Sequence, residues 1–128
     1  MEQIQERIQR KAAEIEDIIK AYLPEETGLQ RSVLEAMNYS VKAGGKRLRP
    51  LFMREVYRLF AGGSGADGSD NPVRAGMESI LVEPFMAAIE MIHTFSLIHD
   101  DLPCMDNDRL RRGQPTTWVR YGYDMAVL

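Results

Sequence analysis

Apolar residues recur at helical spacing along most of the chain, in segments that proline and glycine separate. Residues 4–23 place isoleucine, tyrosine and leucine at this spacing between charged residues, which predicts an amphipathic helix. Pro24 ends it, because the residue before a proline is disfavoured in the α region. A second helix is predicted over residues 29–42, and Gly44 and Gly45 then supply the left-handed turn that stops a helix.

The second half of the chain continues the helical pattern. A third helix is predicted to open near Pro50, since proline is favourable in the first turn of a helix. Residues 62–71 are rich in glycine, serine and aspartate and predict a flexible loop. A mostly apolar segment follows over residues 72–102, interrupted by Pro84. Within it, residues 85–98 are apolar on most faces, as expected of a helix buried in a larger bundle.

No alternating strand pattern stands out, so the sequence predicts an all-α fold. We expect residues 1–128 to form part of a single helical domain. Residues 121–128 have the pattern of the start of an apolar helix without a stop signal, and we therefore expect further sequence to follow them.

Composition narrows the class of protein. Of the 128 residues, 45% are hydrophobic and 27% are charged, so the chain carries enough apolar side chains to fold. The net charge of −3 argues against general nucleic-acid binding. The single cysteine, Cys104, excludes an internal disulfide and a four-cysteine zinc site. No uninterrupted apolar run reaches the ~18 residues of a membrane span and the charged start is unlike a signal peptide, so we expect a cytoplasmic protein without a membrane span.

Four carboxylates gather at the end of the long apolar segment: Asp100, Asp101, Asp106 and Asp108. Carboxylates this close repel one another unless they share a cation, and hard oxygen ligands suit Mg²⁺ or Ca²⁺. The alternating spacing of an EF-hand is missing, whereas Mg²⁺ bound by one or two carboxylates and by phosphate oxygens fits an aspartate pair. A solvated acidic helix end is the alternative.

Cations and a histidine accompany the acidic cluster. Arg109, Arg111 and Arg112 follow it directly, where they could hold anionic oxygens that a metal does not neutralise. His93 and Asp100 are seven residues apart and therefore share one helical face.

A second cluster, Lys46, Arg47 and Arg49, surrounds the turn after the glycine pair. Exposed backbone N–H groups and the N-terminus of the next helix make this turn a plausible phosphate cradle, although it lacks the Walker A frame. A basic targeting tract and a solvated turn are the alternatives. Together, the acidic and basic clusters predict a site for two polyphosphates, one bridged through metal and one held directly by lysine and arginine.

These residues resemble a known family, the head-to-tail trans-isoprenyl diphosphate synthases. Residues 44–50 (GGKRLRP) match its GGKRxRP element, and residues 90–106 (EMIHTFSLIHDDLPCMD) match the helix that carries its first aspartate-rich motif. The match continues through residues 106–117 and covers roughly residues 29–128. Class I terpene cyclases share an aspartate motif but lack the GGKRxRP element. The resemblance implies the N-terminal half of an antiparallel helical bundle of the isoprenoid synthase type, in a homodimer or higher oligomer.

The resemblance also implies roles for individual residues. The Mg²⁺ ligands, which are the catalytic residues of the ionisation step, correspond to Asp100, Asp101 and Asp106. The resemblance implies that Arg111 contacts the allylic diphosphate. It implies that the diphosphate of isopentenyl diphosphate is contacted by Lys46, Arg49, His93 and Arg112. Chain length is set below the aspartate helix, at positions that correspond to Phe95 and Ser96.

The implied activity is a prenyltransferase. It ionises dimethylallyl or geranyl diphosphate with the help of Mg²⁺, lets isopentenyl diphosphate attack the carbocation, and loses a proton to give farnesyl diphosphate. The aromatic ring of Phe95, with the enlarged motif at Pro103 and Cys104, indicates the bacterial farnesyl type, because a ring on the wall should block a growing chain. Ordinary core packing is the alternative role for Phe95. The alternatives are a geranylgeranyl diphosphate synthase and a non-catalytic diphosphate-binding or regulatory subunit of a larger synthase.

Two features depart from the family. Trp118 stands where a histidine or another small polar residue is usual, and it is either neutral or crowds the substrate entrance. Family members are also more than twice as long, and their second aspartate-rich motif is absent here. We therefore expect a truncated chain whose own activity is uncertain and whose apolar helix at residues 85–98 is incompletely covered.

Overall fold

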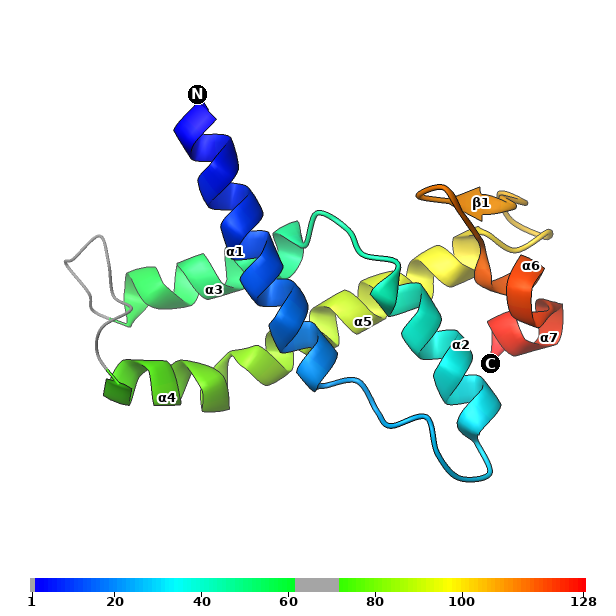
Figure 1. Ribbon diagram of the computed structural model, residues 1–128, viewed down its shortest axis with the longest axis horizontal. Coiled ribbons are helices and arrows are strands. Elements are labelled where there is room, and N and C mark those ends of the chain that lie inside the picture. Colours follow the sequence, from blue (N-terminus) through cyan, green and yellow to red (C-terminus); the bar gives the residue numbers. More distant parts are fainter. Residues whose placement is uncertain (1, 62–71) are drawn as a thin grey trace. The chain divides into compact units, whose positions relative to one another are not determined.

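The computed structural model describes residues 2–61 and 72–128 and consists almost entirely of helices (Figure 1). Its all-α character confirms the fold class predicted from the sequence. The predicted loop at residues 62–71 lies outside the described residues. The elements in chain order are α1 (Glu2–Ala21), α2 (Arg31–Lys42), α3 (Leu48–Phe60), α4 (Pro72–Leu81), α5 (Glu83–Asp100), β1 (Leu110–Arg111), β2 (Gln114–Pro115), α6 (Thr117–Tyr121) and α7 (Tyr123–Val127).

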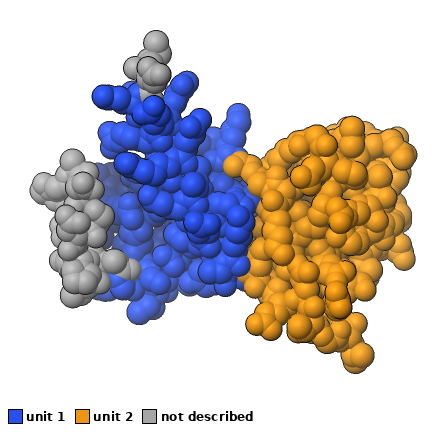
Figure 2. Space-filling model, viewed as in Figure 1, with its two compact units in different colours: residues 1–22, 46–90 blue, residues 23–45, 91–128 orange. Residues whose placement is uncertain are grey.

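The chain divides into two compact units, which Figure 2 shows in different colours. Unit 1 contains residues 1–22 and 46–90, and unit 2 contains residues 23–45 and 91–128. Helix α5 contributes its first part to unit 1 and its second part to unit 2. The two units are described separately below.

Unit 1 is built around the contact of α1 with α3. Ile15 and Ile19 of α1 are fully buried, as expected of the apolar stripe of an amphipathic helix, and Met86 of α5 is buried as well. Ion pairs reinforce this packing. Lys11 of α1 pairs with Glu55 of α3 at 2.7 Å.

Arginines of α3 make two further links within unit 1. Arg54, almost fully buried, pairs through Nη1 with Glu14 of α1 at 3.2 Å, while its Nε and Nη2 have no hydrogen-bond partner among the described residues. Arg58 donates two hydrogen bonds of 2.7 Å to Glu78 of α4. Charged residues thus join α3 to α1 and to α4.

Unit 2 packs α2 against the short helices α6 and α7. Asn38 is buried on α2, and its Nδ2 donates to the carbonyl of Pro24 at 2.9 Å and to Glu26 at 3.1 Å. The hydroxyl groups of Ser40 and Thr117 share a short hydrogen bond that ties α2 to α6. The segment before α2 and the start of α6 are therefore both held by polar groups of α2.

The long apolar segment is broken where the sequence predicted an interruption. Helix α4 ends at Leu81 and α5 begins at Glu83, which places Pro84 in the first turn of α5. Proline has no N–H group, so it cannot donate to the carbonyl four residues earlier, and the helix is interrupted there. The amides of Val82 and Met86 still make bonds of 2.9 Å to the carbonyls four residues before them, so the interruption is local.

Part of the apolar surface of α5 is uncovered in this chain. Met86 and Ala87 are buried, but Phe85, Ile92 and Phe95 are 64%, 63% and 53% exposed. This agrees with the expectation that a partial bundle does not cover this helix fully. Among the described residues, Gly76–Asp100 is long and apolar enough to cross a membrane by length and composition alone. A core helix of a soluble protein can meet that criterion too, so the expectation that the chain has no membrane span stays a prediction.

A two-stranded hairpin was not predicted from the sequence. Strands β1 and β2 pair antiparallel, with Arg111 opposite Gln114, so that Arg112 and Gly113 form the two-residue loop. Both loop residues have positive φ, 54° and 78°, the combination of a type I′ turn that matches the twist of the strands. Two-residue strands are too short to show an alternating pattern, which explains why the sequence did not reveal them.

The loop glycine generates a stability prediction. We expect Gly113→Ala to lower the free energy of unfolding by about 1 kcal/mol, because a Cβ at positive φ is strained even though open space surrounds this position. Gly76→Ala in α4, which also meets open space but lies in a helix, is the matched control and should raise the free energy by about 0.5–1 kcal/mol. Urea unfolding followed by circular dichroism measures both, and equal effects of the two substitutions would contradict the assignment of the turn.

Candidate functional site

The aspartate-rich segment folds into a compact series of turns at the end of α5. The amide of Asp106 donates to the carbonyl of Asp100 at 2.8 Å, so the backbone draws the two ends of the motif together. The amides of Met105 and Asn107 both donate to the carbonyl of Leu102, at 2.9 Å and 3.0 Å. Leu102 is buried and anchors these turns. The segment is therefore an ordered loop that returns upon itself, with Asp106 exposed and Asp100 half-buried.

Asp101 differs from the other aspartates because it is buried and paired. Its two oxygens accept hydrogen bonds from Nε of Arg111 at 3.0 Å and 2.9 Å, and Oδ1 also accepts one from Nη2 at 2.5 Å. These hydrogen bonds raise the pKa of Arg111, although burial acts in the opposite direction. The pair ties strand β1 to the end of α5. Of the three guanidinium nitrogens of Arg111, Nη1 is the one that does not bond to Asp101.

The donor set fits a hard divalent cation with a small number of protein ligands. Within the described ranges, no group of three or more His, Cys, Asp or Glu side chains is gathered as a ready metal cage. Asp100 and Asp106, which the backbone bond brings together, provide carboxylate oxygens of the kind that Mg²⁺ takes in ones and twos, with phosphate oxygens and water completing its shell. Both carboxylate oxygens of Asp101 accept hydrogen bonds from Arg111, so the role of Asp101 as a Mg²⁺ ligand stays a prediction.

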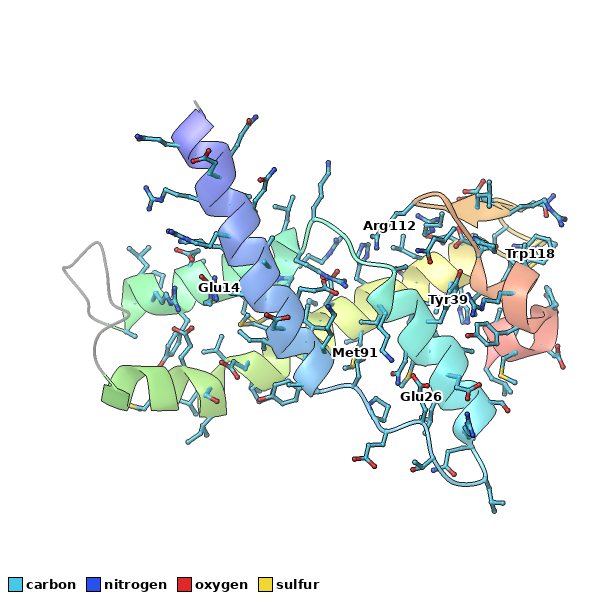
Figure 3. All side chains as sticks on the ribbon, viewed as in Figure 1. Glu14, Glu26, Tyr39, Met91, Arg112 and Trp118 are labelled. Carbon is cyan, nitrogen blue, oxygen red and sulfur yellow. The ribbon has the colours of Figure 1, made fainter. Side chains whose placement is uncertain are left out.

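The tip of the hairpin contacts the glycine turn in unit 2. A Cβ built on Gly45 would lie 3.0 Å from Nη2 and 3.1 Å from Cζ of Arg112. Gly45 also has a φ of 156°, so close approach and backbone conformation both favour glycine there. The structure thus brings Arg112, a predicted diphosphate ligand, against the residue that precedes Lys46. Figure 3 labels Arg112 beside the hairpin.

The basic turn continues into unit 1, where its three cations differ. Lys46 and Arg49 are exposed, and in the described part of the chain neither forms an ion pair. Arg47 is buried and donates to Glu16 at 2.6 Å and to Glu90 at 2.7 Å. The sequence grouped all three residues as one cluster, and only the tertiary structure separates the paired cation from the two exposed ones.

His93 and Ser96 lie on the second part of α5. His93 is half-buried, and its backbone carbonyl accepts a hydrogen bond of 2.8 Å from the hydroxyl of Ser96. That bond turns the Ser96 hydroxyl back onto its own helix. The contacts implied for His93 on a substrate, and for Ser96 in setting chain length, stay predictions.

An apolar cavity of about 320 Å³ lies within unit 2, lined by α2, α5 and the C-terminal helices. Phe95 lies on its wall, and the ring of His99 is 4.2 Å from that of Phe95 between centroids. Ser96 is not among the lining residues. The sequence pointed to Phe95 but missed other lining residues, which include Met37 of α2 and Met125 of α7. An amphipathic pattern shows that such residues are apolar, but it does not show which cavity they enclose.

Trp118 secures the loop that follows the aspartate-rich motif. Its indole Nε1 donates to the carbonyl of Asp108 at 2.7 Å, and the hydroxyl of Thr116 donates to the same carbonyl at 2.9 Å. The guanidinium of Arg109 lies over the indole ring, 5.3 Å from its centroid. Trp118, labelled in Figure 3, therefore anchors this loop, a role that neither of the two sequence interpretations contained.

Comparison with known proteins places this geometry in a family. The model of the polyprenyl synthetase family matches residues 30–128. A chloroplastic geranylgeranyl pyrophosphate synthase from Catharanthus roseus is 49% identical over 94 residues, which are 73% of this chain and 22% of that protein. A farnesyl diphosphate synthase from Bacillus subtilis is 45% identical over 114 residues, which are 89% of this chain and 33% of that protein. The chain thus spans about a fifth to a third of the length of these relatives.

Solved structures show the same fold. A crystal structure of an FPP/GFPP synthase from Zymomonas mobilis matches with a TM-score of 0.74 and 35% identity, covering 98% of this chain and 40% of that one. A geranyltransferase from Helicobacter pylori matches with a TM-score of 0.71 and 30% identity, covering 94% of this chain and 38% of that one. Because the family model matches most of this chain, the chain belongs to the polyprenyl synthetase family of prenyltransferases and carries the N-terminal part of the isoprenoid synthase fold.

Proposed function

We propose that this chain provides the first aspartate-rich wall and the basic turn of a farnesyl diphosphate synthase. The complete reaction joins isopentenyl diphosphate to dimethylallyl or geranyl diphosphate. The observation that carries the proposal is the apolar cavity of about 320 Å³, which Phe95 and His99 line directly before Asp100. An ionic site followed by an apolar cavity on one helix suits a substrate that has a diphosphate head and a hydrocarbon tail.

The proposed roles follow the chemistry of each group. Asp100 and Asp106, together with Asp101 by resemblance, hold Mg²⁺, which when bound neutralises charge on the departing diphosphate. Arg111 keeps its Nη1 for an oxygen of the allylic diphosphate, while Asp101 fixes the orientation of its guanidinium. Breaking the allylic C–O bond leaves the electron pair on the diphosphate. The guanidinium of Arg111 stabilises the negative charge that develops there.

The second substrate, isopentenyl diphosphate, carries a diphosphate and a carbon–carbon double bond. Its binding needs cations from the protein, and the double bond itself acts as the nucleophile. We propose Lys46, Arg49, His93 and Arg112 as the ligands of its diphosphate. The exposed, unpaired state of Lys46 and Arg49 within the described residues supports this role, since they can bind an anion without first giving up a protein partner.

A geranylgeranyl diphosphate synthase is the second candidate. The relatives that match include both geranylgeranyl and farnesyl synthases at similar identity, so identity alone does not decide the product. Phe95 on the cavity wall favours the shorter product, because an aromatic ring there occupies space that a longer chain needs. A non-catalytic diphosphate-binding subunit is the third candidate and predicts binding without turnover.

Asp100 provides the test of the reaction. The purified chain is incubated with Mg²⁺, isopentenyl diphosphate and geranyl diphosphate. If it forms farnesyl diphosphate, we expect Asp100→Ala to reduce the rate at least about 100-fold, because stabilisation of the leaving group is lost. Asp17→Asn, an exposed aspartate on α1, is the control and should leave the rate unchanged. Mass spectrometry of the products measures both. A folded wild-type chain that binds diphosphates but forms no product would favour the non-catalytic subunit.

Phe95 provides the test of product length. Phe95→Ala removes a ring from the cavity wall and should shift the products toward geranylgeranyl diphosphate, with a matching gain in affinity for that compound relative to farnesyl diphosphate. Phe52→Ala, an exposed phenylalanine on α3 that does not line the cavity, is the matched control. Product analysis and calorimetric binding measure the two effects. If products and relative affinity are both unchanged in Phe95→Ala, its role in length control is wrong.

A further inference from the structure

The buried cation of the basic turn is held by two helices that are remote in sequence. The Arg47 side chain is 1% exposed, its Nε donates to Glu16 of α1 at 2.6 Å, and its Nη1 donates to Glu90 of α5 at 2.7 Å. Burial lowers the pKa of Arg47, but the hydrogen bonds to Glu16 and Glu90 outweigh it and the net shift is upward. Both carboxylates are thus engaged with Arg47, and this guanidinium stays charged at any physiological pH.

The backbone of Arg47 has a conformation that needs such support. Its φ of 48° and ψ of 32° are left-handed, which is unusual for a residue other than glycine, and it is the N-cap residue of α3. A strained conformation persists where surrounding contacts determine it more strongly than local preference does. The direction in which the chain enters α3 depends on this residue, and Lys46 and Arg49 lie on either side of it.

We propose that Glu16 and Glu90 are positioning residues for diphosphate binding. By holding Arg47 in the left-handed conformation, they fix the orientation of Lys46 and Arg49 toward a bound diphosphate. The inference rests on the proposed function, in which these two cations bind isopentenyl diphosphate. It also gives α1 a part in substrate binding, although the family model matches only residues 30–128.

The test uses charge-removing variants of similar shape. Glu16→Gln and Glu90→Gln each keep the size of the side chain while removing one anionic partner of Arg47. Glu14→Gln is the matched control, because Glu14 lies on the same helix, where Figure 3 labels it, and pairs with Arg54 rather than with the basic turn. Lys20→Gln controls for the second, more exposed ion pair of Glu16, at 3.7 Å.

The readout is the dissociation constant for two ligands, each added alone so that no turnover occurs. Calorimetry with Mg²⁺ measures isopentenyl diphosphate and a geranyl thiolodiphosphate, whose sulfur makes it slow to ionise. We expect Glu16→Gln and Glu90→Gln to weaken binding of isopentenyl diphosphate about tenfold, the scale of one charge-assisted hydrogen bond, and to leave the allylic analogue unchanged. Glu14→Gln and Lys20→Gln should bind both ligands as the wild-type chain does.

Each other result has a distinct meaning. Wild-type affinity for isopentenyl diphosphate in both test variants overturns the inference. An equal loss of affinity for the two ligands, or a matching loss in Glu14→Gln, also overturns it, because either result indicates a general loss of folded structure. Circular dichroism identifies the folded range of each variant, and Glu16→Gln decides the matter if Glu90→Gln does not fold. A folded wild-type chain that binds neither ligand contradicts the proposed function itself, and the inference with it.

Discussion

The burial of one guanidinium between two carboxylates is the constraint on which unit 1 depends. Removing a charged group from water is costly unless opposite charges and hydrogen bonds compensate for it. Arg47 meets this condition only when α1 supplies Glu16 and α5 supplies Glu90, so its burial requires both helices to be in place. Arg54 is also buried but has one ionic partner, Glu14, and two nitrogens without partners among the described residues. The more completely satisfied arginine is the one at the basic turn.

Unit 2 uses a comparable arrangement around the aspartate-rich segment. Asp101 and Arg111 join the end of α5 to the hairpin, and the carbonyl of Asp108 accepts hydrogen bonds from Thr116 and Trp118 on the other side of the loop. A loop tied at both ends presents its remaining carboxylates with little conformational freedom. Such preorganisation matters for ligand binding, because groups that are already oriented lose less entropy when a ligand arrives.

The exposed apolar surface is the counterpart of these satisfied polar groups. Phe85 and Ile92 of α5 are largely exposed, and so are Phe52 and Phe60 of α3. Apolar patches of this kind on a helical protein mark surfaces that other structural elements cover. The match with the Zymomonas mobilis synthase covers 40% of that chain.

Local sequence was sufficient for the longer helices and for the choice of candidate residues. Apolar periodicity and proline positions predicted α1, α2, α3 and the interruption at Pro84, because helix formation and its breaks depend on neighbours within a few residues. The same short range explains why the basic turn and the aspartate-rich segment were visible as clusters.

Only the tertiary structure decided how these residues are used. It buried Arg47 while leaving Lys46 exposed, paired Asp101 with Arg111, and gave Trp118 a carbonyl to bind. Each of these outcomes depends on a partner 10 or more residues away, such as Glu90 at a separation of 43. A one-dimensional pattern shows that a side chain is charged or aromatic. The energy of a buried charge or hydrogen bond depends on which distant group the fold brings next to it, and that information is not contained in local spacing.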